Sequence, residues 1–148
     1  MGWTTVGSFL GRDVRFQRVE PAQGIDAQDI SSSVVMLVIG VEFASFEAVE
    51  ILSSRILSLA PLAMVLTGPG GRVGFDVTLE LQSRRPELPH TMTKLSVATD
   101  PVEAIEDFLQ ATWPAEERLD EWKTYSVLVF GDSTVETEIR EAIGIALS

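Results

Sequence analysis

Residues 34–39 read VVMLVI, an uninterrupted apolar run in which most side chains are β-branched. Such a run is typical of a strand that is covered on both faces, as the strands of a parallel sheet are. Gly40 ends the run, and Ser45 stands at a suitable N-cap position for a helix that reaches to about Leu59. This stretch therefore predicts a buried strand followed by a helix.

The same unit of a strand and a helix recurs three times downstream. Each repeat joins an apolar run to an amphipathic segment: residues 62–66 with 75–84, 94–98 with 101–109, and 125–130 with 135–146. Alternation of this kind implies parallel strands joined by right-handed crossovers, with helices on both faces of the sheet. We therefore expect a three-layer α/β domain, Rossmann-like or flavodoxin-like, with about four parallel strands.

The N-terminal part differs from this regular core. Residues 13–19 alternate polar and apolar side chains, which predicts a half-buried strand, and their arginines favour a position at the sheet edge. Residues 1–33 are thus interpreted as an edge strand and a loop, and residues 34–148 as the repeated core. A length of 148 residues fits one domain.

Charge is unevenly distributed along the chain. The net charge is −11, of which residues 1–99 contribute −2 (8 bases, 10 acids) and residues 100–148 contribute −9 (3 bases, 12 acids). Nucleic acid and anionic membranes would be repelled by the acidic part, so we expect neither as a partner. A basic protein partner is expected instead, although acidic side chains also serve solubility alone.

Other bulk features exclude further classes. The chain has no cysteine, which excludes disulfides and thiolate metal sites. Its longest apolar runs are far shorter than the roughly 20 residues of a membrane span, and no signal peptide is evident. A cytoplasmic location is therefore expected.

The acidic part also predicts a surface for that partner. Glu103, Glu106 and Asp107 recur at helical spacing, so they should share the solvent-facing side of one helix. A second short helix is expected after Pro114. The further candidates for partner contact follow Pro114: Glu117, Asp120, Glu121 and Trp122. Trp122 either anchors a partner or covers the core.

A ligand site would form at the carboxyl ends of the parallel strands. Its candidate residues follow the expected strands: Glu42, Thr67, Gly68, Gly70, Gly71, Arg72, Asp100, Asp132 and Ser133. The glycines suit either an anion-binding turn or a tight turn that needs a positive φ. Glu42, Asp100 and Asp132 suit Mg²⁺. The alternative is that Asp100 caps a helix and that Asp132 is a turn residue beside the N-cap expected at Ser133. We expect no metal or other cofactor.

No catalytic constellation is predicted. His90 is the only histidine and stands between prolines in a loop, and no G-x-S-x-G motif supplies a serine for a triad. The glycine turn matches neither the G-x-G-x-x-G nor the G-x-x-x-x-G-K-[ST] pattern.

The C-terminal half resembles a family of small bacterial proteins of unknown function. The segments that carry the likeness are DPVEAIEDFL at residues 100–109, ATWP at 111–114, VLVFG at 127–131 and EIREA at 138–142, together with Gly68-Pro69. The family has a Thr-Trp-His run before the acidic helix, where this chain has TKLSV. The resemblance implies a Rossmann-like fold and no particular activity.

Two functions remain open from the sequence. One is a non-catalytic interaction protein for a basic partner, of which a toxin-neutralising immunity protein is an example. The alternative is a small-ligand or nucleotide-binding module, or an enzyme, that uses the strand-end loops. A concave, clustered site at the strand ends would favour the alternative.

Overall fold

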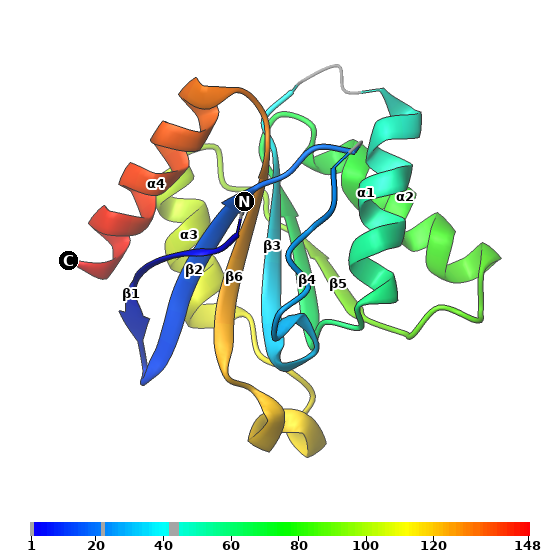
Figure 1. Ribbon diagram of the computed structural model, residues 1–148, viewed down its shortest axis with the longest axis horizontal. Coiled ribbons are helices and arrows are strands. Elements are labelled where there is room, and N and C mark those ends of the chain that lie inside the picture. Colours follow the sequence, from blue (N-terminus) through cyan, green and yellow to red (C-terminus); the bar gives the residue numbers. More distant parts are fainter. Residues whose placement is uncertain (1, 22, 42–44) are drawn as a thin grey trace.

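The residues that the structure describes form a six-stranded sheet flanked by four α-helices. A computed structural model describes residues 2–21, 23–41 and 45–148 (Figure 1). The strand order is β1-β2-β6-β3-β4-β5, and only β1 runs antiparallel to its neighbour. The strands are β1 (Thr4–Phe9), β2 (Arg12–Arg18), β3 (Ser33–Ile39), β4 (Ala63–Thr67), β5 (Met92–Leu95) and β6 (Thr124–Phe130). The helices are α1 (Phe46–Ser58), α2 (Gly71–Arg84), α3 (Pro101–Ala111) and α4 (Ser133–Leu147), with short 3₁₀ helices η1 (Ile30–Ser32) and η2 (Glu116–Glu121).

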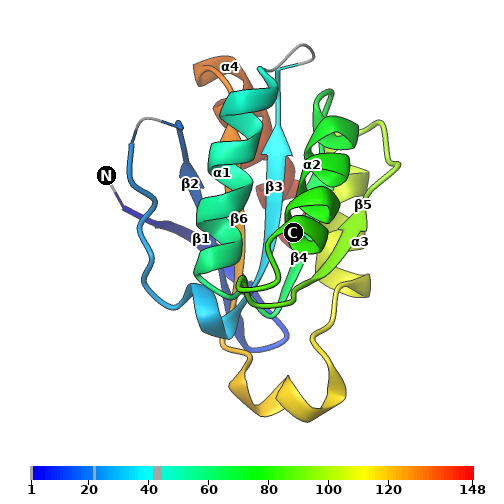
Figure 2. The ribbon, with the colours of Figure 1, turned by 90° about the vertical axis from the view of Figure 1, so that its right-hand side faces the viewer.

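The helices cover both faces of the sheet, as the continuous apolar run in β3 predicts. Val34, Met36 and Val38 pack in one core with α3 and α4. The alternate residues of β3 pack in a second core with α1 and α2. Figures 1 and 2 show the two helix pairs on opposite sides of the strands. The three-layer α/β prediction is therefore confirmed, and every residue of β3 is buried because both faces are covered.

The prediction that residues 13–19 form the strand at the sheet edge is wrong. β2, which contains the predicted segment, lies inside the sheet between β1 and β6, so that five strands are mutually parallel and β1 forms the edge. Arg15 is accommodated there at 6 % exposure. Its guanidinium donates hydrogen bonds to Ser126 Oγ (2.9 Å) and the Gln28 carbonyl oxygen (2.6 Å), and lies over the Trp3 ring. An arginine with a satisfied head group can bury its stem in an interior strand.

The chain reverses direction across the sheet after β5. The first crossovers, β3 to β4 and β4 to β5, move outward with α1 and α2 on one face. The segment after β5 then runs through α3 and η2 and returns β6 to a place between β2 and β3. Adjacent strands β4 and β5 therefore send their following helices to opposite faces.

Side-chain caps begin three of the α-helices. Ser45 Oγ accepts the N–H of Ala48, and Asp100 accepts the N–H of Val102. The last helix is capped by Asp132 rather than by Ser133, which is its first residue.

The second helix starts earlier than residue 75, where we predicted it. α2 begins at Gly71, because the N–H groups of Gly71 and Gly74 bond to the carbonyl oxygens of Gly68 and Gly70 and so wind the glycine turn into the helix. In the described part of the chain, no helix combines the length and apolarity needed to cross a membrane.

Candidate functional site

A cavity of about 680 Å³ opens at the carboxyl ends of β3, β4 and β5, on the face covered by α3 and α4. These strand ends lie at the top of the molecule in Figures 1 and 2. The wall comprises the end of β3, the β4–α2 turn, the β5–α3 loop and the N-terminal halves of α3 and α4. No single segment of the chain forms this cavity.

The topology explains why the cavity forms at this place. The turn after β4 leads to α2 on one face, and the loop after β5 leads to α3 on the other. The two connections diverge, and a crevice remains between them above the strand ends. Open parallel sheets bind ligands at such points, where neighbouring connections separate.

The lining is mainly apolar with a few polar groups. Its apolar residues include Met36, Val38, Leu95, Ala104, Ile105, Val135 and Ile139. The polar and charged residues in the lining are Thr67, Arg72, Ser96, Thr99, Asp100 and Glu138. Small-molecule sites commonly combine an apolar wall with a small number of placed polar groups.

Ser96 has a polar atom without a partner at this cavity. Its Oγ is shielded from solvent and makes no hydrogen bond, whereas its N–H donates to the Leu66 carbonyl oxygen at 2.9 Å. A buried hydroxyl that lacks a hydrogen bond costs free energy. Because the Oγ atom is shielded, it is not itself exposed to the cavity.

The glycine turn is a packing device in this structure. Gly68 has a φ of +88°, and a Cβ there would lie 2.6 Å from the Ile39 carbonyl oxygen. The same oxygen accepts the Gly70 N–H at 2.9 Å. The N–H of Gly71 bonds to Gly68 within the turn. These N–H groups are occupied by the protein's own carbonyl oxygens, so they are not free to hold a phosphate.

The predicted ligand residues are only partly brought together. Thr67, Gly68, Arg72 and Asp100 line the cavity, whereas Gly70, Gly71, Asp132 and Ser133 do not. Glu42 lies outside the described residues.

Sequence reasoning did not select Ser96 and Glu138, which also line the cavity. The predicted strand at residues 94–98 placed Ser96 inside the strand, whereas β5 ends at Leu95, so no sequence signal marked this residue. Val135, Glu138 and Ile139 share one helical stripe, but only the fold brings that stripe to this cavity.

The described residues contain no group of three or more His, Asp and Glu side chains placed to hold a metal ion. The grouping of Glu42, Asp100 and Asp132 is not tested, because Glu42 lies outside this part. His90 is exposed in the α2–β5 loop and is not part of the cavity lining.

A second hollow, of about 710 Å³, lies along α1 and is lined also by Arg85. Most of its polar groups, though not Glu47, already have partners among the described residues. Arg55 donates to the carbonyl oxygens of Pro21 and Gln23, and Arg85 donates to Ser54 Oγ at 3.0 Å. This groove therefore offers fewer free polar groups than the strand-end cavity.

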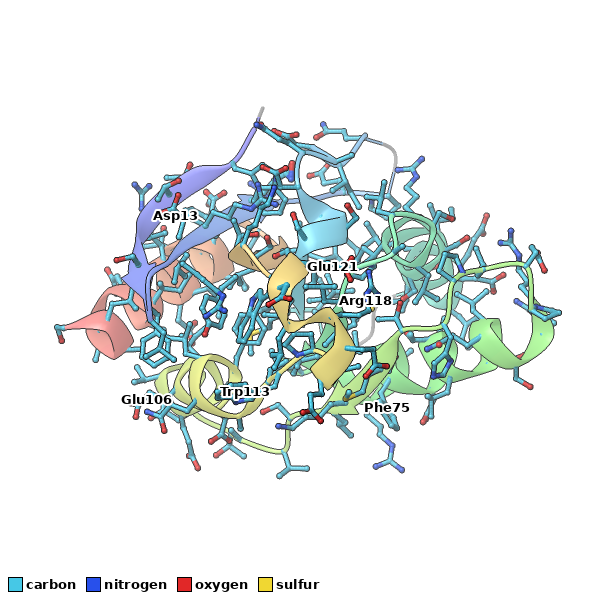
Figure 3. The ribbon with its side chains drawn as sticks, turned by 90° about the horizontal axis from the view of Figure 1, so that it is seen from below. Asp13, Phe75, Glu106, Trp113, Arg118 and Glu121 are labelled. Atoms are coloured by element: carbon cyan, nitrogen blue, oxygen red, sulfur yellow. The ribbon has the colours of Figure 1, made fainter. Side chains whose placement is uncertain are left out.

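The acidic candidates for partner contact lie on α3 and η2. All six carboxylates are exposed: Glu103, Glu106, Asp107, Glu117, Asp120 and Glu121. Figure 3 shows η2 and Trp113 from below, at the end of the molecule opposite the strand-end cavity.

Trp122 is not part of this exposed surface, contrary to the prediction of partner contact. It is only 5 % exposed and packs edge-to-face against Tyr125 and Trp113. Its place in the sequence, directly before a strand that is buried between two others, draws the ring into the core. Of these two tryptophans, Trp113, which is 51 % exposed, is the one that solvent reaches.

Comparisons with known proteins returned no match to a family model, a curated protein or a solved structure. The resemblance of the C-terminal half to a family of small bacterial proteins therefore stays a prediction.

Proposed function

We propose that this protein binds a small, largely apolar molecule in the cavity at the carboxyl ends of β3, β4 and β5. The observation that carries the proposal is the cavity itself, formed where the connections after β4 and β5 diverge. Its volume of about 680 Å³ lies within the range of roughly 300–1,000 Å³ that is usual for ligand pockets. In this proposal the sheet is used as Rossmann-like and flavodoxin-like domains use theirs, with the ligand at a switch point.

Nucleotides are a disfavoured class of ligand. A phosphate group needs free N–H donors or positive charge, and the N–H groups of Gly70 and Gly71 bond within the protein. A nucleotide at a hundred times its Kd would stabilise the fold by about 2.7 kcal/mol. We expect no rise in melting temperature with a panel of mono-, di- and triphosphates.

A neutral fluorophore tests the proposed cavity. N-phenyl-1-naphthylamine should bind with saturable fluorescence enhancement. Ala104→Leu places a larger side chain in the cavity wall and should weaken that binding, since Ala104 lines the cavity. Ala111→Leu is the matched control, because Ala111 lies on the same helix, is exposed and is not part of the lining. Equal binding by both variants would reject the cavity as the site.

Contact with a basic protein is a second candidate function. The observation in its favour is the exposed ring of Trp113, which lies between the acidic helix α3 and the acidic segment η2. Tryptophans at interfaces contribute strongly to binding, and surrounding charge accelerates encounter with an oppositely charged partner. This arrangement suits a non-catalytic, immunity-like protein.

Charge reversal tests this second function. Replacing Glu106 and Asp107 by lysine should slow association with a basic partner captured from the host, and added salt should slow the unmodified protein similarly. Glu47→Lys with Glu80→Lys changes the net charge equally on helices of the opposite face and should have less effect. An association rate that changes neither with salt nor with the charge reversal on α3 would indicate that the carboxylates serve solubility only.

Two further interpretations are also proposals. We place the protein in the cytoplasm, which cell fractionation tests. We also relate its C-terminal half to a family of small bacterial proteins, which a solved structure of a family member with the same strand order would support.

A further inference from the structure

The charged residues that line the strand-end cavity differ in how far they are already paired. Arg72 is mostly solvent-exposed, and its Nε lies 3.7 Å from Asp76 Oδ2 on the same helix. Glu138, in the second turn of α4, forms no ion pair within the described residues. Asp100 uses Oδ1 for its cap. The lining therefore contains two carboxylates, those of Asp100 and Glu138, and one cation, Arg72, which is already paired.

Several groups that could hold an anion near this cavity already have partners. Asp100 caps α3 through the N–H of Val102, and Asp132 caps α4 through the N–H of Val135, each at 3.0 Å. Each aspartate thereby places a negative charge at the positive end of its helix dipole. In the glycine turn, the N–H groups of Gly70 and Gly71 bond to the carbonyl oxygens of Ile39 and Gly68. An anionic ligand would be left with Arg72 and the start of α2, which no side chain of the described residues caps.

The uncharged polar residues of the lining offer a ligand little. Ser96 Oγ is shielded from solvent, and Thr67 is buried. The remaining lining is apolar and suits an alkyl or aryl body.

We infer that the cavity takes a small organic cation, an alkyl or aryl body that carries one protonated amine. The amine lies at the carboxylates of Glu138 and Asp100, and the apolar body lies against the wall formed by β3, α3 and α4. A charge-assisted hydrogen bond between an ammonium and a carboxylate is stronger than its neutral counterpart, and the apolar wall takes the body of the ligand out of water. This inference rests on the proposed function, because it names the ligand class of the same cavity.

Three ligands of equal body and different head group test it: 3-phenylpropylamine, 3-phenylpropan-1-ol and 3-phenylpropanoate. Each competes with the neutral fluorophore N-phenyl-1-naphthylamine for the full-length protein at physiological salt and pH 7. We expect the amine to displace the fluorophore at a concentration about tenfold lower than the carboxylate does, with the alcohol between them, a ratio equal to about 1.4 kcal/mol.

Glu138→Gln should remove most of that preference while leaving binding of the alcohol unchanged. Asp100→Asn should act in the same direction, and its amide oxygen still caps α3. Glu141→Gln is the control, because it removes an equal charge from the same helix at a position that does not line the cavity. This control separates local contact from the general attraction of a protein with a net charge of −11.

The outcomes separate this inference from the proposed function. A fluorophore that does not bind would overturn both. A fluorophore displaced by the alcohol, with the carboxylate equal to or better than the amine, would overturn the cation inference and leave the ligand cavity standing. An amine preference that survives both Glu138→Gln and Asp100→Asn would also overturn it, because the amine would then lie elsewhere.

Discussion

Arg12 lies over the indole ring of Trp122, with its Cζ atom 3.9 Å from the ring centroid. The Nε of Arg12 also donates a 3.1 Å hydrogen bond to the carbonyl oxygen of Trp122. Trp122 in turn contacts the ring of Tyr125, at a centroid distance of 5.2 Å. The pair thus joins the start of β2 to the segment that leads into β6, across 110 residues of sequence.

Trp122 should therefore contribute far more to stability than Trp113. Removing a buried tryptophan side chain costs about 3–5 kcal/mol, so Trp122→Ala should lower the free energy of unfolding by that amount. Trp113→Ala should cost much less, because about half of the Trp113 side chain already faces water. Urea denaturation of both variants measures the difference. Equal losses would contradict the assignment of Trp122 to the core.

Asp100 should contribute to stability through its cap and to ligand binding through its charge. Asp100→Ala removes the hydrogen bond to the Val102 N–H and should cost about 0.5–2 kcal/mol. Asp100→Asn should keep most of that stability, because asparagine caps helices well. Thermal denaturation of the two variants separates the roles. An alanine variant as stable as the original protein would show that the cap is unimportant.

Two glycines inside helices should respond to alanine in opposite directions. Gly144→Ala in α4 should stabilise the fold by about 0.5–1 kcal/mol, because glycine is a poor helix former and a Cβ there would meet nothing within 4 Å. Gly74→Ala in α2 should destabilise it, since the new Cβ would lie 2.5 Å from Ile39 Cδ1. Chemical denaturation measures the change in the free energy of unfolding for each variant. An increase for both variants would show that α2 does not pack closely on β3.

Stability should fall in alkaline solution through Tyr125. Burial raises the pKa of Tyr125, against a smaller opposing effect of Arg12. A group whose folded-state pKa is raised contributes stability below its unfolded pKa, about 10 for tyrosine, and loses it as the pH rises through the folded value. Tyr125→Phe has no proton to lose, so its stability should decline less above pH 10. Urea denaturation of both proteins from pH 8 to 11 tests this. An equal fall in the free energy of unfolding with pH in the two proteins would exclude a role for Tyr125.

The sequence by itself determines the three layers and most of the elements. The VVMLVI run at residues 34–39 predicts burial on both faces, and such burial is possible only with helices on each side. Ser45 and Asp100 mark helix starts through a local hydrogen bond of their own side chains. Those starts can therefore be recognised from a few neighbouring residues in the sequence. The exposure of Glu106 and Asp107 follows from helical spacing in the same way.

Only the tertiary structure decides the order of the strands and the site. β2 looks like an edge strand because of its arginines, yet β6 pairs with it from more than a hundred residues away and gives Arg15 a partner in Ser126. The cavity likewise joins Ser96 after β5 to Glu138 on α4, which no local pattern connects. Periodicity and capping report what a residue does with its neighbours in sequence. Strand order and cavity lining depend instead on long-range pairing and on which face each crossover takes.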